Sequence, residues 1–249
     1  MSAKTGVGAP VLRKEDFRFI TGKGQYTDDI NRQDQAYAYF LRSPHAHANI
    51  KKLDVSAAKK APGVLGVLTG DDLAADKIGG LICGWMIHSK DGSPMKAGAH
   101  PALAQGKVRY VGDHVAVVIA ETQAQARDAL EKIEVDYKVL SPVVSMSDAV
   151  KAGAPVIHDV APDNIVYHWH LGDEAATQAA FAKAAHVTKL DLVNNRLVPN
   201  PMEPRAAVGD YDSGQDCFTL YTTSQNPHVA RLVLSAFIGI APEHKLRVI

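Results

Sequence analysis

The sequence predicts a mixed fold of the α+β or α/β type, divided between two domains. Strand-like and helix-like segments alternate along the chain, most clearly in residues 108–140, where an apolar strand precedes a helix and an alternating strand. The length of 249 residues suits one large domain or two of about 100–200 residues each. A stretch rich in proline, serine and glycine at 141–164 places the boundary near 145–165.

The composition narrows the class of protein. A formal net charge of zero argues against a nucleic-acid-binding protein, and 46% hydrophobic residues suffice for a real core. No stretch approaches the roughly 20 apolar residues of a membrane span, and the N-terminus lacks the apolar region of a secretory signal. We therefore expect a cytoplasmic protein. Cys83 and Cys217 are too few for a disulfide framework or an iron–sulfur cluster and are expected to be buried, reduced thiols.

The first half of the chain predicts an N-terminal arm over 1–20 and a domain over 21–145. Within the domain, 74–106 shows no sustained periodicity and is longer than a usual loop, so it is either functional or a partner contact. The other segments alternate as strands or end at a Pro-Gly pair. We expect strands at 35–43, 48–56 (as a neighbour of the first) and 64–70, with a short helix at 56–61.

The unit at 108–140 has the clearest pattern. His114–Ala120 is a nearly continuous apolar strand. Thr122 and Gln125 have the spacing of a capping box, in which each side chain satisfies a free backbone N–H at the helix start. A helix and then an alternating strand at 133–139 follow.

After a linker at 146–164, we expect a second domain over 165–249. Asp173 is a good N-cap for a helix that begins at Glu174. Asp212-Ser213-Gly214 between two alternating runs predicts a hairpin. The remaining expectations are a strand at 187–193, an irregular loop at 199–205, a strand at 217–223, a helix from 227, and a final strand at 245–249.

Gln225 lies between a strand and a helix. Asn226 is a good N-cap, Pro227 suits the first helical position, and Gly239 is a suitable C-terminal stop. In α/β folds, ligands bind outside the carboxyl ends of strands, and a neutral amide there offers donors and an acceptor without charge. From geometry alone the simpler interpretation is structural, with the amide bound to a neighbouring loop carbonyl.

The sequence stops at Ile249, within the last expected strand. If that strand is parallel to 217–223, its carboxyl end lies on the same side as Gln225. We therefore expect residues after 249 to complete any site at Gln225.

Several long motifs occur in series. "GKGQYTDDI", "LRSPHAHANIKKLDVSAAKKAPGVLGVLTGDDL" and "KVRYVGDHVAVVIAETQAQARDALEKIEVDYKVL" resemble the α/β hammerhead domain of the xanthine dehydrogenase and aldehyde oxidase family. "NNRLVPNPMEPRAAVGDYD", "LYTTSQNPHVARLVLSAFIGI" and "HKLRVI" resemble the start of the molybdopterin-binding domain that follows it. The resemblance runs in order over about 20–249, and carbon monoxide dehydrogenase-like large subunits look the most similar.

The resemblance implies hydroxylation with water-derived oxygen at a molybdenum centre. It implies that Gln225 hydrogen-bonds an oxo ligand of the metal in molybdopterin cytosine dinucleotide. Electrons would leave through [2Fe-2S] clusters to FAD on partner subunits. The family's glycine-rich "GGGFG" segment, its active-site loop and its C-terminal glutamate base have no counterpart in these residues. Glu203 is not assigned as that base, and a structural pairing with Arg205 is the expected role.

Other polar residues have weaker patterns. His45 and His47 form an i, i+2 pair, as do His168 and His170. Such a pair shares one strand face and permits metal binding, yet no zinc-ligand spacing accompanies either pair. Surface or buried structural histidines are the simpler interpretation. His228, in the first turn after Gln225, is left open between a ligand-facing and a solvent-facing role.

Two functions remain open. The chain is either the N-terminal part of a molybdenum hydroxylase large subunit, which works with a C-terminal remainder, an iron–sulfur subunit and a FAD subunit, or a non-catalytic stand-alone module. In the second case the edge of the last strand and the apolar helix face Leu232–Phe237 should be covered, because exposed strand edges invite aggregation. Solubility of the isolated chain separates the two.

Overall fold

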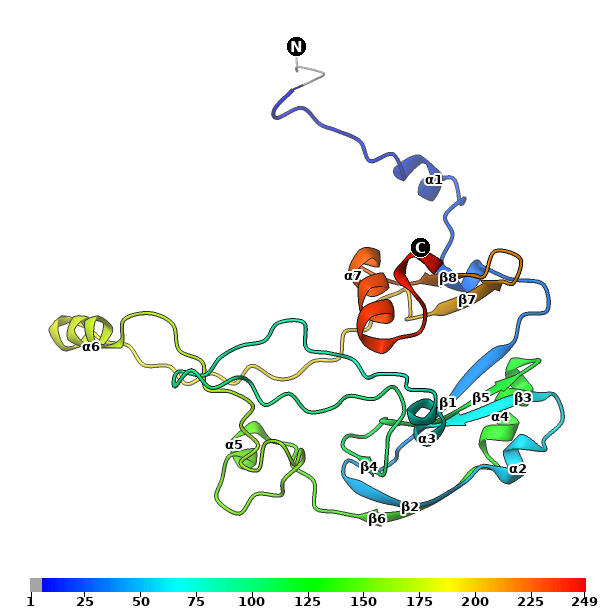
Figure 1. Ribbon diagram of the computed structural model, residues 1–249. Helices are drawn as coiled ribbons and strands as arrows, with labels where there is room; N and C mark the ends of the chain where they lie inside the picture. The colour runs from blue at the N-terminus through cyan, green and yellow to red at the C-terminus, as the bar shows by residue number, and fades with distance from the viewer. Residues whose placement is uncertain (1–5) are drawn as a thin grey trace.

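The strands of the first domain form two antiparallel sheets, and those of the second domain form one mixed sheet (Figure 1). The computed structural model describes residues 6–249, and all statements below concern this part of the chain. The first sheet has the order β1 (Tyr37–Arg42), β5 (His114–Ala120), β3 (Val64–Thr69). The second has the order β4 (Lys107–Val108), β2 (Ala48–Asp54), β6 (Glu134–Val139).

The expected pairing of the strands at 35–43 and 48–56 is wrong. β1 pairs with β5, whereas β2 pairs with β6 and β4, so the two consecutive strands lie in different sheets. β5 is apolar on both faces and takes the centre of its sheet, where both edges and both faces are covered. The strands themselves form as expected, and the pairing is decided by burial of β5 rather than by proximity in sequence.

Helix α4 (Gln123–Leu130) connects the two sheets and packs against β1, β3 and β5. Its inward positions are the small residues Ala126 and Ala129, both fully buried, which allow close approach to the sheet. This core also contains the buried side chains of Ala58, Val67, Ala116, Val118, Ala120 and Ile133. A second cluster under the other sheet is formed by Ala48, Ala104, Val108 and Val115.

Capping residues fix two helix starts. The Thr122 hydroxyl accepts a hydrogen bond from the Gln125 N–H at 3.2 Å, as expected. The Gln125 side chain, however, accepts from the Thr122 hydroxyl and not from the Thr122 backbone N–H, so the second half of the expected capping box is not formed. A complete capping box is present at α3 (Gly70–Ala75). There the Asp72 carboxylate accepts from the Thr69 backbone N–H at 2.7 Å, and the Thr69 hydroxyl accepts from the Asp72 N–H.

The second domain is built on β7 (Ala207–Asp212), β8 (Cys217–Thr222) and β9 (Leu246–Val248). β7 and β8 form the expected hairpin, and β9 runs parallel to β8. The expected helix is also present, as α7 (Pro227–Leu232) continued by a π-helical turn, η2 (Val233–Ile238). It ends at Gly239 with φ of 82°, a left-handed conformation that suits glycine.

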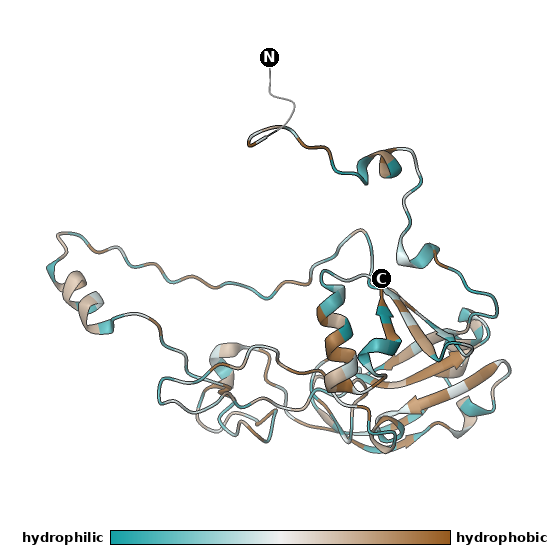
Figure 2. Ribbon diagram, turned by 45° about the horizontal axis from the view of Figure 1, so that its top comes forward, coloured by the Kyte–Doolittle hydropathy of each residue, from teal (hydrophilic) through white to brown (hydrophobic). Residues whose placement is uncertain are grey.

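Before β7 the chain makes a long excursion away from the sheets (Figure 2). Helix α6 (Glu174–Lys183) has its expected N-cap, since Asp173 Oδ1 accepts from the Ala176 N–H at 2.9 Å, yet α6 has no buried residue. The expected strand at 187–193 is wrong for this part of the chain, where the residues are extended without a strand partner. The remaining short elements are α1 (Asp16–Ile20), η1 (Thr27–Asp29), α2 (Ser56–Lys59), α5 (Met146–Ala149) and η3 (Glu243–Lys245).

Two of the contacts between the domains lie near the second-domain sheet and its helix. Arg32 Nε lies 3.0 Å from Asp210 Oδ2, and the same guanidinium donates to the Tyr221 hydroxyl and stacks over its ring. From the long loop after α3, the Gly79 N–H donates to the Ile238 carbonyl at 2.8 Å. The 74–106 segment therefore contacts the end of the helix that follows Gln225.

Candidate functional site around Gln225

The strand exits at Gln225 have the geometry expected for a ligand site in an α/β fold. The parallel pairing of β8 with β9 matches Phe218 with Leu246 and continues beyond both strands. The Thr222 N–H donates to the Ile249 carbonyl at 3.0 Å, and the Ile249 N–H donates to the Leu220 carbonyl at 2.9 Å. Both strands therefore leave the sheet on the same side, and Gln225 lies on that side.

The residue that follows Gln225 makes its hydrogen bonds within the start of helix α7. Asn226 Oδ1 accepts from the Val229 N–H at 3.2 Å, and the Asn226 N–H donates to Ser224 Oγ at 3.1 Å. The Gln225 side chain is exposed and has no hydrogen bond to any residue that the structure describes. The structural interpretation expects a loop carbonyl bound to the Gln225 amide, and none of the described residues provides one. The amide N–H groups therefore have no partner among these residues.

The proline-rich loop lies beside the Gln225 segment. The Thr223 hydroxyl donates to Glu203 Oε1 at 3.4 Å, and the Thr222 hydroxyl donates to the Ala206 carbonyl at 3.2 Å. The expected pairing of Glu203 with Arg205 is wrong, because within residues 6–249 no ion pair joins them and the carboxylate faces Thr223. In the sequence, the two consecutive threonines at the end of β8 are the feature that could have predicted this contact.

The histidines have different environments. His47 is 4% exposed and its Nδ1 lies 2.9 Å from the Ser141 carbonyl, while His45 packs edge-on against Tyr137. His168 and His170 are exposed in a loop. His228 lines a groove of about 440 Å³ beside β8 and β9. Among the described residues, no three or more His, Cys, Asp or Glu side chains converge in a way that could hold a metal ion.

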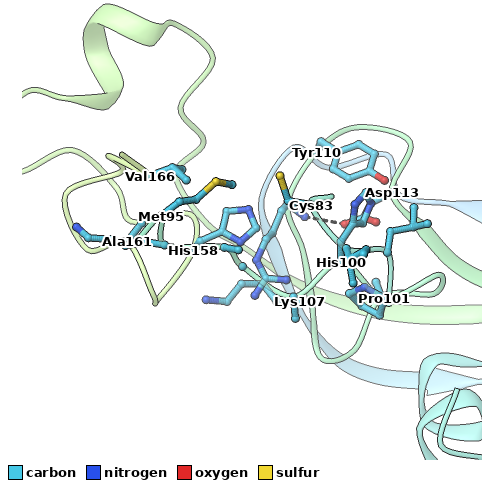
Figure 3. A pocket seen from close by; sticks show the side chains of 18 of the residues that line it. Cys83, Met95, His100, Pro101, Lys107, Tyr110, Asp113, His158, Ala161 and Val166 are labelled. Carbon is cyan, nitrogen blue, oxygen red and sulfur yellow. Dashed lines mark hydrogen bonds between the residues drawn. The ribbon is translucent and has the colours of Figure 1, made fainter. Parts of the chain in front are cut away.

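A separate cleft, which Gln225 does not line, is formed by loops at the edge of the first domain (Figure 3). It measures about 390 Å³ and is lined by loop residues 81–83, 95–101 and 158–166 with the edge of the second sheet. Lys107 pairs with Asp159 at 3.5 Å, and Arg109 Nε donates to the Ile157 carbonyl at 3.2 Å, so these cations mainly tie the loops together. Burial, with Arg109 close by, lowers the pKa of His158.

Cys83 lines this cleft and is exposed, and Cys217 is half-buried. The expectation that both thiols are buried is therefore wrong. Cys83 lies on the long irregular loop, where no strand or helix packs over it, and its Sγ donates to the Trp85 carbonyl. Both cysteines are free, as expected.

Comparison with known proteins gives two domain matches in chain order. Residues 21–141 match the a/b hammerhead domain of aldehyde oxidase and xanthine dehydrogenase, and residues 157–249 match the molybdopterin cofactor-binding domain. A hammerhead domain followed by the start of a molybdopterin cofactor-binding domain defines the class as molybdenum-dependent oxidoreductase large subunits.

The relatives agree with both matches. The carbon monoxide dehydrogenase large chain of Afipia carboxidovorans is 37% identical over 98% of this chain and 30% of the relative. The nicotine 6-hydroxylase large subunit of Paenarthrobacter nicotinovorans is 35% identical over 94% of this chain and 28% of the relative. The chain thus belongs to the xanthine dehydrogenase and aldehyde oxidase family of molybdopterin-binding large subunits, and it spans about 30% of the length of these relatives.

Solved structures show the same arrangement. Quinoline 2-oxidoreductase from Pseudomonas putida 86 superimposes with a TM-score of 0.84 at 33% identity, over 96% of this chain and 29% of that one. Carbon monoxide dehydrogenase from Oligotropha carboxidovorans gives 0.82 at 36% identity, over 98% and 30%. Across residues 6–249, no helix combines the length and apolar character needed to cross a membrane.

Proposed function

We propose that this chain is the N-terminal part of the catalytic large subunit of a molybdenum hydroxylase and that Gln225 binds its cofactor. The support is the free, exposed Gln225 amide at the exit of two parallel strands, in a chain of this family. The domain division that we propose is 21–145 for the hammerhead domain, 146–164 for the linker and 165–249 for the start of the cofactor-binding domain.

The residues present fit a molybdenum cofactor in one respect. The Gln225 amide is a neutral donor with no partner in the structure, so it can bind a cofactor oxygen without breaking an existing hydrogen bond. Molybdopterin cytosine dinucleotide is the form that we propose, and when bound it supplies the two-electron redox chemistry of hydroxylation. Asn226 fixes the backbone next to Gln225 by capping α7, which holds the amide near the strand exits.

The glutamate base and the rest of the substrate pocket would come from the polypeptide that the relatives have in addition. We propose an aldehyde, an N-heterocycle or carbon monoxide as the substrate class, because the names of similar proteins include an aldehyde oxidoreductase, a nicotine hydroxylase and carbon monoxide dehydrogenases. Partner subunits with [2Fe-2S] clusters and FAD would accept the electrons, in the cytoplasm. By itself the chain would be inactive.

The test is Gln225→Ala in the complete, molybdenum-loaded enzyme. Loss of one hydrogen bond to a charged or strongly polar group corresponds to about 1.5–3 kcal/mol, so turnover should fall about 10- to 150-fold. The thermal unfolding temperature should not change, because the side chain is exposed and makes no hydrogen bond to the described residues.

Gln215→Ala is the matched control, since Gln215 is also an exposed glutamine and lies at the other end of β8. It should leave turnover unchanged. Unchanged turnover of Gln225→Ala, in an enzyme whose molybdenum content equals that of the unsubstituted enzyme, would remove the proposed role.

A further inference from the structure

The cleft of Figure 3 combines an apolar wall with an excess of positive charge. The apolar wall consists of Leu81, Ile82, Met95 and Val166. The ionised side chains of the lining are three cations and one carboxylate, in a chain whose formal net charge is zero: Lys96, Lys107, Arg109 and Asp113. Its volume of about 390 Å³ lies within the range of about 300–1,000 Å³ that small-molecule sites occupy. The cleft therefore has the size and lining of a site for a small molecule with an apolar body and a negative charge.

Two of the three cations have little of their charge neutralised by the protein. The Lys107 side chain is 22% exposed, and its only ion pair among the described residues is the 3.5 Å contact with Asp159, whose side chain is 78% exposed. Such a pair is screened by water and contributes little. Arg109 donates through Nε to the Ile157 carbonyl, and within residues 6–249 no carboxylate forms an ion pair with its guanidinium. Lys107 and Arg109 can therefore both bind an anion, whereas Lys96 is already paired with a carboxylate at 3.1 Å.

His158 is affected by the same cations. Its pKa is lowered by burial first and then by Arg109, and His100 and Lys107 act in the same direction, while Asp159 opposes them. These groups therefore lie close enough together to disfavour one more positive charge in the cleft. An anion bound among them would remove this repulsion.

Glycines allow the loops of the cleft to pack closely. A Cβ at Gly98 would lie 2.6 Å from His158 Nδ1, and a Cβ at Gly80 would lie 2.6 Å from the His100 carbonyl oxygen. The Leu81 N–H donates to that same carbonyl at 2.8 Å. The positions of the apolar wall and of the histidines are thus fixed by backbone contacts, so the lining is preformed and does not require a ligand to assemble it.

We propose that this cleft binds a small organic carboxylate, with its charged group at Arg109 and Lys107 and its apolar body against the apolar wall. A guanidinium can hold a carboxylate by two parallel N–H···O bonds. Asp113 lines the same cleft and disfavours a doubly charged anion such as phosphate, while the apolar wall favours a ligand with a hydrocarbon body.

The proposed site is separate from Gln225, and its existence does not depend on the role of Gln225. The two regions are nevertheless connected by the loop after α3. Gly79 donates to the Ile238 carbonyl at the end of η2, and Leu81 of the apolar wall follows two residues later. A carboxylate in the cleft would therefore contact the loop that touches the helix following Gln225.

Titration calorimetry of the complete large subunit with benzoate and with hexanoate tests the proposal. We expect at least one of them to bind at a single site. Its uncharged analogue, benzyl alcohol or hexanol, and inorganic phosphate should each bind at least about 10-fold more weakly. Because a bound carboxylate raises the pKa of His158, binding near pH 6.5 should take up protons. Titrations in two buffers of different ionisation enthalpy measure this uptake.

Substitutions locate the site. Lys107→Met and Arg109→Gln should each weaken carboxylate binding about 10-fold or more. Lys107→Met is the safer of the two for folding, because Arg109 also holds the Ile157 carbonyl. Lys52→Met is the matched control, since Lys52 lies in the same sheet and has one exposed ion pair, with Asp54 at 3.2 Å, but does not line the cleft. It should leave the affinity unchanged.

Three results would overturn the proposal: no binding of either carboxylate, equal affinity for the uncharged analogue, and an equal loss in Lys52→Met and Lys107→Met. A carboxylate that binds at the strand exits instead would lose affinity in Gln225→Ala and keep it in Arg109→Gln, which also contradicts the proposal. The readout needs neither molybdenum nor turnover. An enzyme whose turnover is unchanged by Gln225→Ala but which binds the carboxylate through Lys107 would refute only the proposed role of Gln225, so the two failures are distinguishable.

Discussion

The first-domain sheet β1-β5-β3 and the extended segment 185–202 contain similar apolar residues in opposite environments. In β5, Val118 and Ala120 are fully buried against α4, and Val115 is fully buried in the second cluster on the other face. In the extended segment, Leu192 and Leu197 are about as exposed as in an unfolded chain. The comparison teaches that strand-forming sequence becomes a strand only where a partner is present.

The largest expected effect comes from Val118→Ala, which opens a cavity at the centre of the first sheet. We expect the free energy of unfolding of the first domain to fall by about 2–3 kcal/mol, measured by denaturant unfolding together with hydrogen exchange of β5. Leu192→Ala in the isolated chain should change it by less than about 0.5 kcal/mol. Equal costs for the two substitutions would break the comparison.

Gly79→Ala tests whether a contact made by a loop is less costly to disturb than the packed core of the first sheet. A Cβ at Gly79 would lie 2.4 Å from the Phe237 carbonyl oxygen, so the loop must move away and lengthen its hydrogen bond to Ile238. We expect a local cost of about 1–2 kcal/mol, seen as faster exchange in η2 and unchanged exchange in β5. Gly84→Ala, in the same loop with open space around it, should have no effect, and a matching loss there would contradict the role of the close contact.

The smallest expected effect is a pH dependence of the first domain. Burial first, and then Arg42, lowers the pKa of His114 at the start of β5, while Asp113 opposes the shift. His114 therefore binds a proton more readily in the unfolded chain than in the folded chain. The contribution of neutral His114 to the free energy of unfolding is complete above about pH 6.5 and is lost as the pH falls below that value. His114→Gln should reduce the slope of unfolding free energy between pH 7.5 and 5.5, with a remainder from His158, whose pKa is also lowered. An unreduced slope would contradict this assignment.

Local patterns in the sequence predicted most individual elements. The apolar run of β5, the Asn226 cap and the Gly239 stop all specify local conformations that depend on few distant contacts. At the candidate site the sequence left the parallel pairing of β8 with β9 as a condition, which the structure meets, and it missed the hydrogen bond from Thr223 to Glu203. Such contacts between segments depend on the path of a proline-rich loop, for which side-chain periodicity gives no information.

By itself, the sequence determined the two-domain order, the family and the position of Gln225 between a strand and a helix, because these depend on residue types and their spacing. Only the tertiary structure decided that β1 and β2 belong to different sheets, that Cys83 is exposed, and that residues 187–193 have no partner within the described chain. The physical reason is that strand pairing and burial are set by surfaces that meet over long sequence separations, and a local pattern cannot specify which surfaces those are.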